Sequence, residues 1–250
     1  MRRNVWARCR MLLLLSVVAG CTVSPVTPTD QPAPEMIDHC GVGCPLGGGP
    51  QTLHRNGYSL NNNGSTKFAN WVAYRITKDT SAPGRNRNWR SDPLISAQET
   101  LDPDDYHEAY KTLSVDRGHQ ANLASMGAVP NWQALNFLSN ITPQKEGLNK
   151  GAWARLEERE RSMSRAVEID AVYVITGPLY ERYIGTLPAA KKQHTIPSGY
   201  WKIIYIGNSP AEGDYAAFVM DQMTPRNADF CAFQVTVEEI ERRAGLVMWS

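Results

Sequence analysis

The sequence lacks both an excess of one charge and an apolar run long enough to span a membrane. Its formal net charge is +1, and the first 21 residues contribute four arginines and no acids, so the remainder has 22 basic and 25 acidic residues, a net charge of −3. Such a chain has no basic coat, so any nucleic-acid binding must come from a local arginine cluster and be strongly salt-sensitive. The apolar run Met11–Ala19 is shorter than the about 20 residues of a transmembrane helix.

The first 21 residues are typical of an export signal. An arginine-bearing stretch precedes the apolar run, which ends in Val18-Ala19-Gly20-Cys21, and Thr22 rather than an aspartate follows. Small residues before a cysteine are typical of a bacterial lipoprotein signal, which is cleaved as the cysteine is lipidated. We therefore expect an exported protein, anchored through Cys21 to the outer membrane or lying in the periplasm. Ordinary signal cleavage with secretion to the exterior is the alternative.

Residues 22–36 are rich in proline and threonine and nearly free of large apolar side chains. Such a segment cannot bury enough surface to fold, so we expect a semi-extended tether. The expected organisation is a signal at 1–21, the tether at 22–36 and one folded domain at 37–250, in which no internal repeat is visible.

Cysteine is scarce, with five residues in the whole chain, two of them in the expected signal. Cys40 and Cys44 are spaced to close a small disulfide loop in an oxidising compartment. A zinc half-site is the competing interpretation, but no second pair of ligands follows at a suitable spacing. Cys231 is left over from either arrangement.

Strand patterns dominate the domain. The stretch 67–77 alternates apolar and polar residues and is rich in aromatic and β-branched types, which predicts a strand. A short strand at 112–116 is expected to deliver His119 to its end, and periodicity does not decide between a helix and an extended run at 131–138. Further strands are expected at 171–176, 200–206 and 215–221.

Two helices stand out from this pattern. Good helix formers without an internal proline predict a long helix at 150–167. Thr236 as N-cap and Gly245 just past the end predict a last helix at 235–245. Strands with one long helix inserted, and no regular strand–helix alternation, predict an α+β fold.

The run Asp116-Arg117-Gly118-His119 contains the elements of metal-assisted phosphodiester cleavage. A histidine in a loop is more often structural than catalytic, but a tight polar turn before it makes burial for packing an unlikely explanation. The ordinary pKa of histidine leaves a neutral imidazole near pH 7, able to deprotonate water. A guanidinium beside it suits a phosphate.

Asn149, Trp153, Glu157 and Arg161 follow one another at intervals of four residues, so on one continuous helix they would share a face. Taken alone, the helix is best explained as a salt-bridged, solvated one. Together with His119, the same face would bring an amide oxygen and a carboxylate to one cation and aim an arginine at phosphate.

Two further segments allow both interpretations. Asn140 is either a turn residue or a partner of the histidine or the scissile phosphate. The loop with Arg85, Arg87 and Arg90 around Trp89 is either simply solvated or contacts phosphates and stacks on bases.

With these residues in place, the sequence resembles the DNA/RNA non-specific endonucleases, the sugar-non-specific nucleases of the Serratia type with a ββα-metal (His-Me finger) active site. The similarity covers roughly residues 38–250. It is carried by Asp116-Arg117-Gly118-His119, by Ser139-Asn140-Ile141-Thr142-Pro143-Gln144 and by Leu148-Asn149-Lys150-Gly151-Ala152-Trp153. The segments 71–80, 87–89, 176–181 and 229–231 also match the family pattern.

The resemblance implies a set of roles. His119 would activate the attacking water, and Asn149 would be the direct protein ligand of a single Mg²⁺, for which Mn²⁺ is a possible substitute. Glu157 would hold waters bound to that metal. Arg87 and Arg117 would stabilise charge at the phosphate. Asn140 and Arg161 would support the phosphate and the histidine.

The resemblance also implies a central antiparallel sheet flanked by helices, and single- and double-stranded DNA and RNA as substrates cut to 5′-phosphorylated products. This sequence departs from the family in two places. It has no cysteine after the last helix to pair with Cys231, and the family's dimer-contact histidine is replaced near Asp214, which leaves the oligomeric state open.

Three other functions were weighed against the endonuclease. A surface lipoprotein that binds nucleic acid without catalysis would not need the complete set of candidate catalytic residues. A toxin or effector nuclease would be expected to carry delivery domains, and none fits here. A sequence-specific nuclease would need a separate base-reading module, and none is visible.

Overall fold

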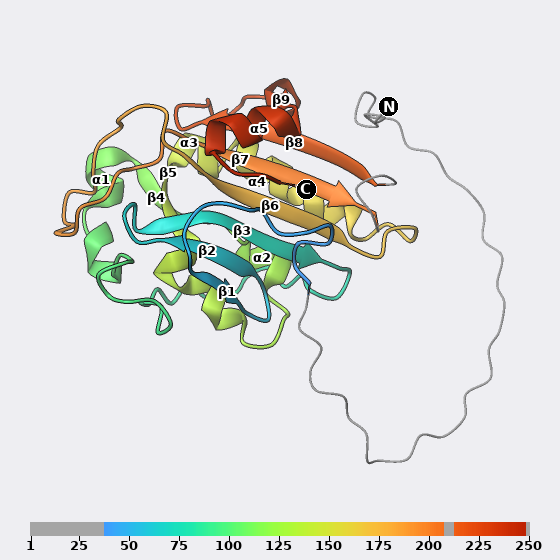
Figure 1. The fold of residues 1–250 in the computed structure, drawn as a ribbon, viewed down its shortest axis with the longest axis horizontal. Helices are drawn as coiled ribbons and strands as arrows, with labels where there is room; N and C mark the ends of the chain where they lie inside the picture. The colour runs from blue at the N-terminus through green and yellow to red at the C-terminus, as the bar shows by residue number, and fades with distance from the viewer. Residues whose placement is uncertain (1–37, 208–212, 249–250) are drawn as a thin grey trace, which may run out of the picture.

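The computed structural model describes residues 38–207 and 213–248, and in this part of the chain the centre is a seven-stranded antiparallel sheet (Figure 1). A separate two-stranded sheet pairs β4 (Val115–His119) with β5 (Ile141–Lys145). In spatial order the seven strands are β1 (Thr52–His54), β2 (Ser59–Asn63), β3 (Phe68–Ile76), β6 (Val172–Leu179), β7 (Gly199–Ile206), β8 (Asp214–Asp221) and β9 (Gln234–Val235).

Successive side chains of a strand point to opposite faces of a sheet, and in the large sheet both faces are covered. In β3, Trp71 and Ala73 pack in one cluster with α5 (Val237–Ala244), whereas Val72 and Tyr74 pack in another with α4 (Ala152–Met163). All four side chains are almost fully buried. The α+β fold predicted from the sequence is therefore confirmed, with helices on both sides of the antiparallel sheet.

Short helices complete the fold on the α4 side and at the ends of strands. They are η2 (Pro103–Tyr106), α1 (Ala109–Leu113), α2 (Leu123–Met126), η3 (Trp132–Asn136), η4 (Leu138–Asn140), α3 (Glu146–Asn149) and η5 (Phe230–Phe233), where η marks a 3-10 helix. None of the helices in the described residues is both long and apolar enough to cross a membrane.

The main strand predictions are confirmed by β3, β6, β7 and β8, with bounds shifted by a few residues. The last helix is confirmed by its caps: the Thr236 hydroxyl accepts from the Glu239 N–H at 3.1 Å, and Gly245 has a left-handed φ of 67°. The prediction at 112–116 was wrong in its bounds. Thr112 belongs to α1, and the strand begins at Val115 and runs through His119 itself.

The long helix predicted at 150–167 is shorter and is interrupted at its start. Gly151, with φ −111° and ψ −117°, separates α3 from α4. A Cβ at this position would lie 2.2 Å from the Gly147 carbonyl oxygen and 2.6 Å from that of Arg226, so only glycine fits. Asn149 therefore ends α3, and the prediction that it shares one helical face with Glu157 and Arg161 was wrong.

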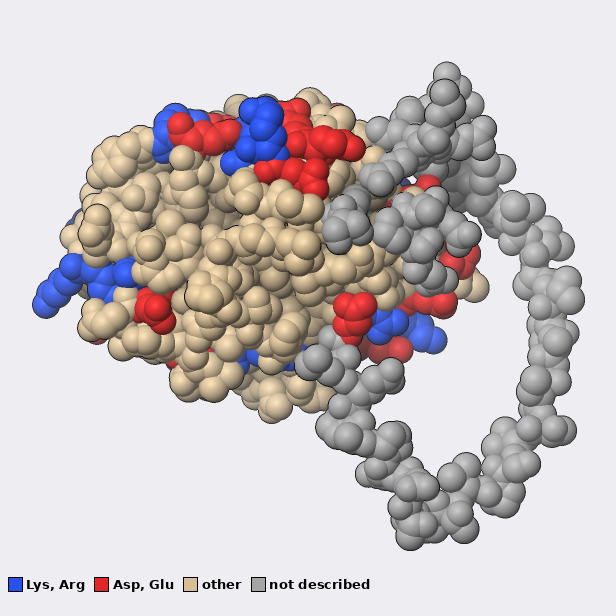
Figure 2. Space-filling view, viewed as in Figure 1, with Lys and Arg blue, Asp and Glu red and all other residues tan. Residues whose placement is uncertain are grey.

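The predicted disulfide between Cys40 and Cys44 is present, on the face of the sheet that α5 covers. Cys231 is exposed and forms no disulfide with another described cysteine. The expected signal, Cys21 and the tether lie outside the described residues. The face drawn in Figure 2 is largely uncharged, with charged side chains of both signs gathered along its upper edge. Arg243 of α5 forms an ion pair with Glu181.

Candidate active site

A cleft of about 770 Å³ lies between the loop 84–89, the strand β4 and the helix α4. Its lining is mostly polar and comes from segments far apart in the sequence. Five of the seven predicted site residues line it, namely Arg87, Arg117, His119, Asn149 and Glu157, whereas Asn140 and Arg161 do not.

The first strand of the β4–β5 pair presents the histidine and one arginine to this cleft. Arg117 and His119 are two residues apart on β4, so they point to the same side. Gly118 between them faces the other side, where a Cβ would lie 2.5 Å from the Gln144 Oε1 atom. The chain then continues from β5 into α3 and α4, an order that is consistent with the expected motif.

His119 is held in one orientation by an asparagine that the sequence did not single out. Its Nε2 atom lies 3.1 Å from the Asn136 Oδ1 atom, and the Asn136 Nδ2 group donates to the Asn86 carbonyl at 3.1 Å. Because the amide nitrogen is used in this way, the oxygen faces the imidazole, Nε2 carries the proton and Nδ1 is the acceptor. Trp89 lies beside the ring, with centroids 5.2 Å apart.

Burial sets the protonation state of this histidine. His119 is 9% exposed, and burial, together with the charge of Arg87, lowers the pKa of His119 to about 4, although the Asn136 contact opposes that shift. The imidazole is therefore neutral at pH 7. A neutral ring with a defined acceptor nitrogen at the edge of a polar cleft is suited to take a proton from water.

Asn149 and Glu157 present oxygen atoms to the same cleft. The Asn149 Nδ2 group donates to the Asp116 Oδ2 atom at 2.9 Å, which leaves Asn149 Oδ1 as the available ligand atom, and Lys150 pairs with the other Asp116 oxygen at 3.2 Å. Burial and the nearby Glu160 raise the pKa of Glu157 to about 7, against the opposing effect of Lys202.

This donor set fits a hard divalent cation. An amide oxygen and a carboxylate are oxygen ligands of the kind that Mg²⁺ accepts, and Mg²⁺ commonly keeps several waters. Within the described residues, no three His, Cys, Asp or Glu side chains come together as a metal cluster.

Two guanidinium groups line the cleft. Arg87 is exposed on its loop. Arg117 is held more firmly, since its Nη2 group donates to the Pro103 carbonyl at 3.1 Å and its Cζ atom lies 5.2 Å from the centre of the Tyr106 ring. Burial lowers the pKa of Arg117, but an arginine remains charged at neutral pH.

Asn140 lies outside the cleft and is fully buried. Its Oδ1 atom accepts from the Ala121 N–H at 2.8 Å, and its Nδ2 group donates to the carbonyls of Ala121 and Leu135 at 3.1 and 2.9 Å. The amide is thus occupied by backbone groups, and the direct partner of His119 is Asn136. Any contribution of Asn140 comes through the backbone just after the histidine.

Arg161 also lies outside the lining of the cleft and contacts it through another residue. Its Nη1 group donates to the Asn122 Oδ1 atom at 2.9 Å, and its Nη2 group pairs with Glu158 at 2.7 Å. Asn122 itself lines the cleft and hydrogen-bonds Glu157, which holds the pKa of that carboxyl below the value that burial alone would give. The arginine therefore supports the side of the cleft that carries Glu157.

Sequence reasoning missed Asn136, Asn122 and the contact made by Asp116. Asn136 follows Leu135 in a stretch where an amide interrupts apolar residues, and that interruption was the available signal. Asp116 was noted as a neighbour of the histidine, but its contact is with Asn149, 33 residues later.

The family model of the DNA/RNA non-specific endonucleases matches residues 36–250. The chain is 59% identical to a nuclease of Serratia marcescens over 217 residues, which covers 86% of this chain and 82% of that protein. It is 28% identical to mitochondrial endonuclease G of Bos taurus, covering 82% and 75% of the two chains. A crystal structure of the EndoG/EndoGI complex shares the fold, with a TM-score of 0.68, 23% identity and coverage of 78% and 84%.

Proposed function

Since the chain belongs to the DNA/RNA non-specific endonuclease family and is an endonuclease, we propose that it is an exported, Mg²⁺-dependent enzyme that hydrolyses DNA and RNA to 5′-phosphorylated oligonucleotides. The observation that carries this proposal is the geometry of one cleft. It holds a neutral histidine oriented by Asn136 and, close by, an amide oxygen oriented by Asp116.

The chemistry proposed for these residues is hydrolysis by an activated water. The Nδ1 atom of His119 accepts a proton from water as the water oxygen bonds to phosphorus and the bond from phosphorus to the 3′-oxygen breaks. The positive charges of Arg87 and Arg117 stabilise the negative charge that accumulates on the phosphate oxygens. The phosphate then remains on the 5′-oxygen of the downstream product.

A divalent cation would be held by Asn149 Oδ1 with the support of Glu157. When bound, Mg²⁺ supplies charge stabilisation at the leaving 3′-oxygen, and Mn²⁺, which prefers similar oxygen ligands, would substitute. The oxygen donors described above support this assignment.

Contacts to phosphate rather than to base edges account for activity on both nucleic acids. Arginines that meet the backbone carry no sequence information, so single- and double-stranded DNA and RNA are all proposed substrates.

Export is part of the proposal. It rests on the signal-like residues 1–21 with the lipidation candidate Cys21, on the tether 22–36, and on the placing of the folded enzyme at 37–250. The Cys40–Cys44 disulfide supports an oxidising compartment, because disulfides persist in the periplasm and outside the cell.

The test uses the purified protein on supercoiled plasmid and on total RNA, with Mg²⁺ or with EDTA. We expect both substrates to be degraded with Mg²⁺ and preserved with EDTA. The products should accept a radioactive phosphate from a 5′-kinase only after phosphatase treatment. A folded protein that shifts DNA in a gel but cuts neither substrate would instead be a binding lipoprotein.

A further inference from the structure

A second hollow, of about 570 Å³, lies behind the loop segment that contacts the histidine. Trp89 faces His119, but the next residue, Arg90, places its Cζ atom 5.8 Å from the centre of the Phe137 ring. Residues 136 and 137 are arranged in the same way: Asn136 contacts His119, whereas the next residue, Phe137, lines the hollow. Arg90 and Phe137 form a parallel β-bridge, so the active-site cleft and the hollow share one pair of backbone segments.

The hollow combines two arginines with an aromatic ring and amide groups. Arg90, Phe137 and the exposed side chains of Asn131 and Gln133 line it, together with Leu94, which is 55% exposed. No carboxylate of the described residues forms an ion pair with Arg90, so its charge is available to a ligand. Arginine and amide donors beside an aromatic face are the groups that bind a phosphate and a stacked base.

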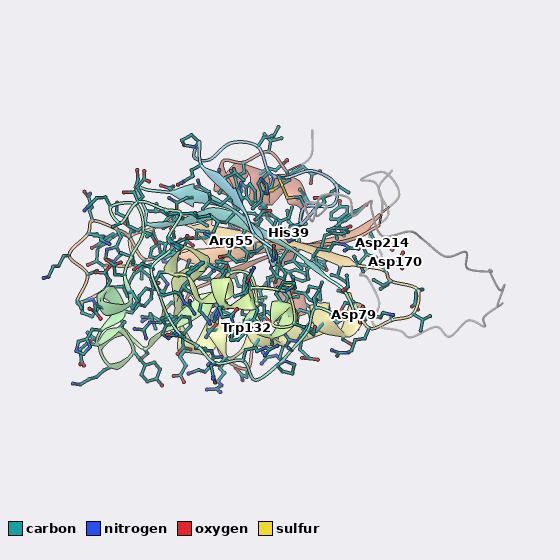
Figure 3. The ribbon with its side chains drawn as sticks, turned by 90° about the horizontal axis from the view of Figure 1, so that it is seen from below. His39, Arg55, Asp79, Trp132, Asp170 and Asp214 are labelled. Atoms are coloured by element: carbon teal, nitrogen blue, oxygen red, sulfur yellow. A yellow bond between two sulfur atoms is a disulfide. The ribbon has the colours of Figure 1, made fainter. Side chains whose placement is uncertain are left out.

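The other arginine of the hollow is already engaged. Arg55 lies 4.9 Å from the centre of the Phe137 ring and pairs with the buried Asp92 carboxylate at 2.5 Å. Arg55 therefore fixes one side of the aromatic ring, while Arg90 packs near the same ring with its charge uncompensated. Figure 3 labels Arg55 just after β1 and Trp132 in η3, the two parts of the chain between which the hollow lies.

An arginine–aromatic pair connects the hollow to the active-site cleft. Arg85 lines the cleft, and its Cζ atom lies 4.9 Å from the centre of the Trp132 ring. Trp132 stands in sequence between Asn131 and Gln133, which line the hollow. Arg85 and the half-buried Trp132 therefore lie between residues of the cleft and residues of the hollow, and an arginine next to an aromatic ring occurs at both places.

We propose that this surface, the flanking groove (Arg85, Arg90, Trp132, Gln133 and Phe137), binds the nucleotides of a single-stranded DNA or RNA segment next to the scissile phosphodiester. The proposal rests on the nuclease function proposed above. Phosphates of the flanking nucleotides meet Arg85 and Arg90, and their bases lie against the arginine–aromatic pairs Arg85–Trp132 and Arg90–Phe137. Long substrates then gain contacts that short ones do not have, without any reading of base sequence.

The test measures binding and cleavage of single-stranded oligonucleotides of about 4 and about 20 nucleotides, lengths that bracket typical single-strand site sizes. Binding is measured in EDTA by fluorescence anisotropy over a range of salt concentrations. The variants are Arg90→Gln and Gln133→Glu, with Arg242→Gln as the matched control. Each changes the net charge by one negative unit, and Arg242 is exposed on α5, on the opposite face of the large sheet.

We expect Arg90→Gln and Gln133→Glu to weaken binding of the long oligonucleotide about 5- to 10-fold, at the low end of the effect of losing one contact to a nucleotide. Arg90→Gln should also lower the slope of log affinity against log salt by about 0.7, as for one phosphate on a single strand. The ratio of kcat/KM on long to short oligonucleotides should fall in both variants and stay at the wild-type value in Arg242→Gln.

If the ratio of kcat/KM on long to short oligonucleotides is equal in all three variants, the proposal that this groove binds flanking nucleotides is wrong. Gln133 is an exposed side chain, so its variant answers the question if Arg90→Gln fails to fold in a thermal-unfolding control. Failure of the nuclease function is distinguishable, because the EDTA binding measurement needs no cleavage. If the protein binds the oligonucleotide through Arg90 but never cuts it, the proposed nuclease reaction is contradicted and the proposed flanking groove is supported.

Discussion

Asn149 donates its amide Nδ2 group to the Asp116 carboxylate at 2.9 Å, and this contact decides which atom of the asparagine faces the cleft. Without it the amide is free to rotate or to present its nitrogen to a cation. Asp116 is thus a positioning residue for the proposed metal site, and it precedes the histidine by only three residues.

Replacement of this aspartate tests the relationship. We predict that Asp116→Ala weakens Mg²⁺ affinity about 10- to 100-fold, the usual effect of removing the partner that orients a metal ligand. The measurement is the Mg²⁺ dependence of cleavage, supported by calorimetric titration. Glu146→Ala is the matched control, because Glu146 also pairs with Lys150, at 3.1 Å, but is not the hydrogen-bond partner of Asn149. Equal effects of the two substitutions would contradict the account.

The partner of the histidine gives a second prediction. Asn136→Leu removes the acceptor that keeps the proton on Nε2, so both tautomers become populated and the ring loses its orientation. We expect kcat to fall about 10²-fold with little change in KM, a loss on the scale of general-base catalysis.

The substitution Asn136→Asp tests the same contact in the opposite direction. A carboxylate at this position favours the charged imidazole, so it should raise the pKa of His119 from about 4 and move the acid limb of the rate profile to higher pH. An unchanged limb would argue against His119 as the base.

Metal binding should depend on pH near neutrality. Burial raises the pKa of Glu157 to about 7, so below that pH the carboxyl is protonated and a cation must displace the proton. We predict that Mg²⁺ affinity falls by up to about tenfold per pH unit below pH 7 and levels off above it. Glu157→Gln should abolish this slope. A wild-type affinity that is flat between pH 5.5 and 8 would contradict the assignment.

The sequence predicted the cleft better than the helix that forms part of it. His119 and Arg117 are spaced by two residues, which fixes their common side on any strand, and their resemblance to a known motif supplied the roles. Asn149 was placed on the wrong helix because the backbone bends at Gly151, where a Cβ would meet both the Gly147 carbonyl and the backbone of Arg226, 75 residues away in the sequence. Local propensity carries no information on such a contact.

Asn136 and the first two strands show the same limit. Nothing within the stretch 131–138 indicates which polar group its asparagine meets, since His119 lies on another element. The strands β1 and β2 were not predicted, because Ser59–Asn63 contains three asparagines in succession. Those asparagines are held there by tertiary partners, as in the Asn61 contact with the Gly49 carbonyl at 2.7 Å.

Acid stability provides a prediction away from the site. Burial lowers the pKa of His39 to about 4, and its ring contacts the Ser59 hydroxyl at 3.0 Å and the Asn56 carbonyl at 3.2 Å. Because the folded-state pKa lies below the unfolded value of about 6.5, protonation favours unfolding. The free energy of unfolding should therefore be retained above pH 6.5 and decrease as the pH falls toward 4, by up to about 3 kcal/mol from this group.

Urea unfolding at pH 7 and pH 4.5 measures this loss. His39→Gln should reduce the difference between the two pH values, whereas substitution of the exposed His107 by glutamine should leave it as in the wild type. An equal pH dependence in all three proteins would mean that His39 does not contribute.

The most direct test of the central claim is the single-turnover rate of plasmid cleavage in saturating Mg²⁺ by the wild type, His119→Ala and Asn149→Ala. Circular dichroism and thermal unfolding would verify that each variant is folded. We predict that both substitutions lower the rate about 10²- to 10⁴-fold while DNA affinity in EDTA is retained, because they remove the base and the metal ligand rather than the phosphate contacts. A folded His119→Ala protein that cuts plasmid at the wild-type rate would contradict the account.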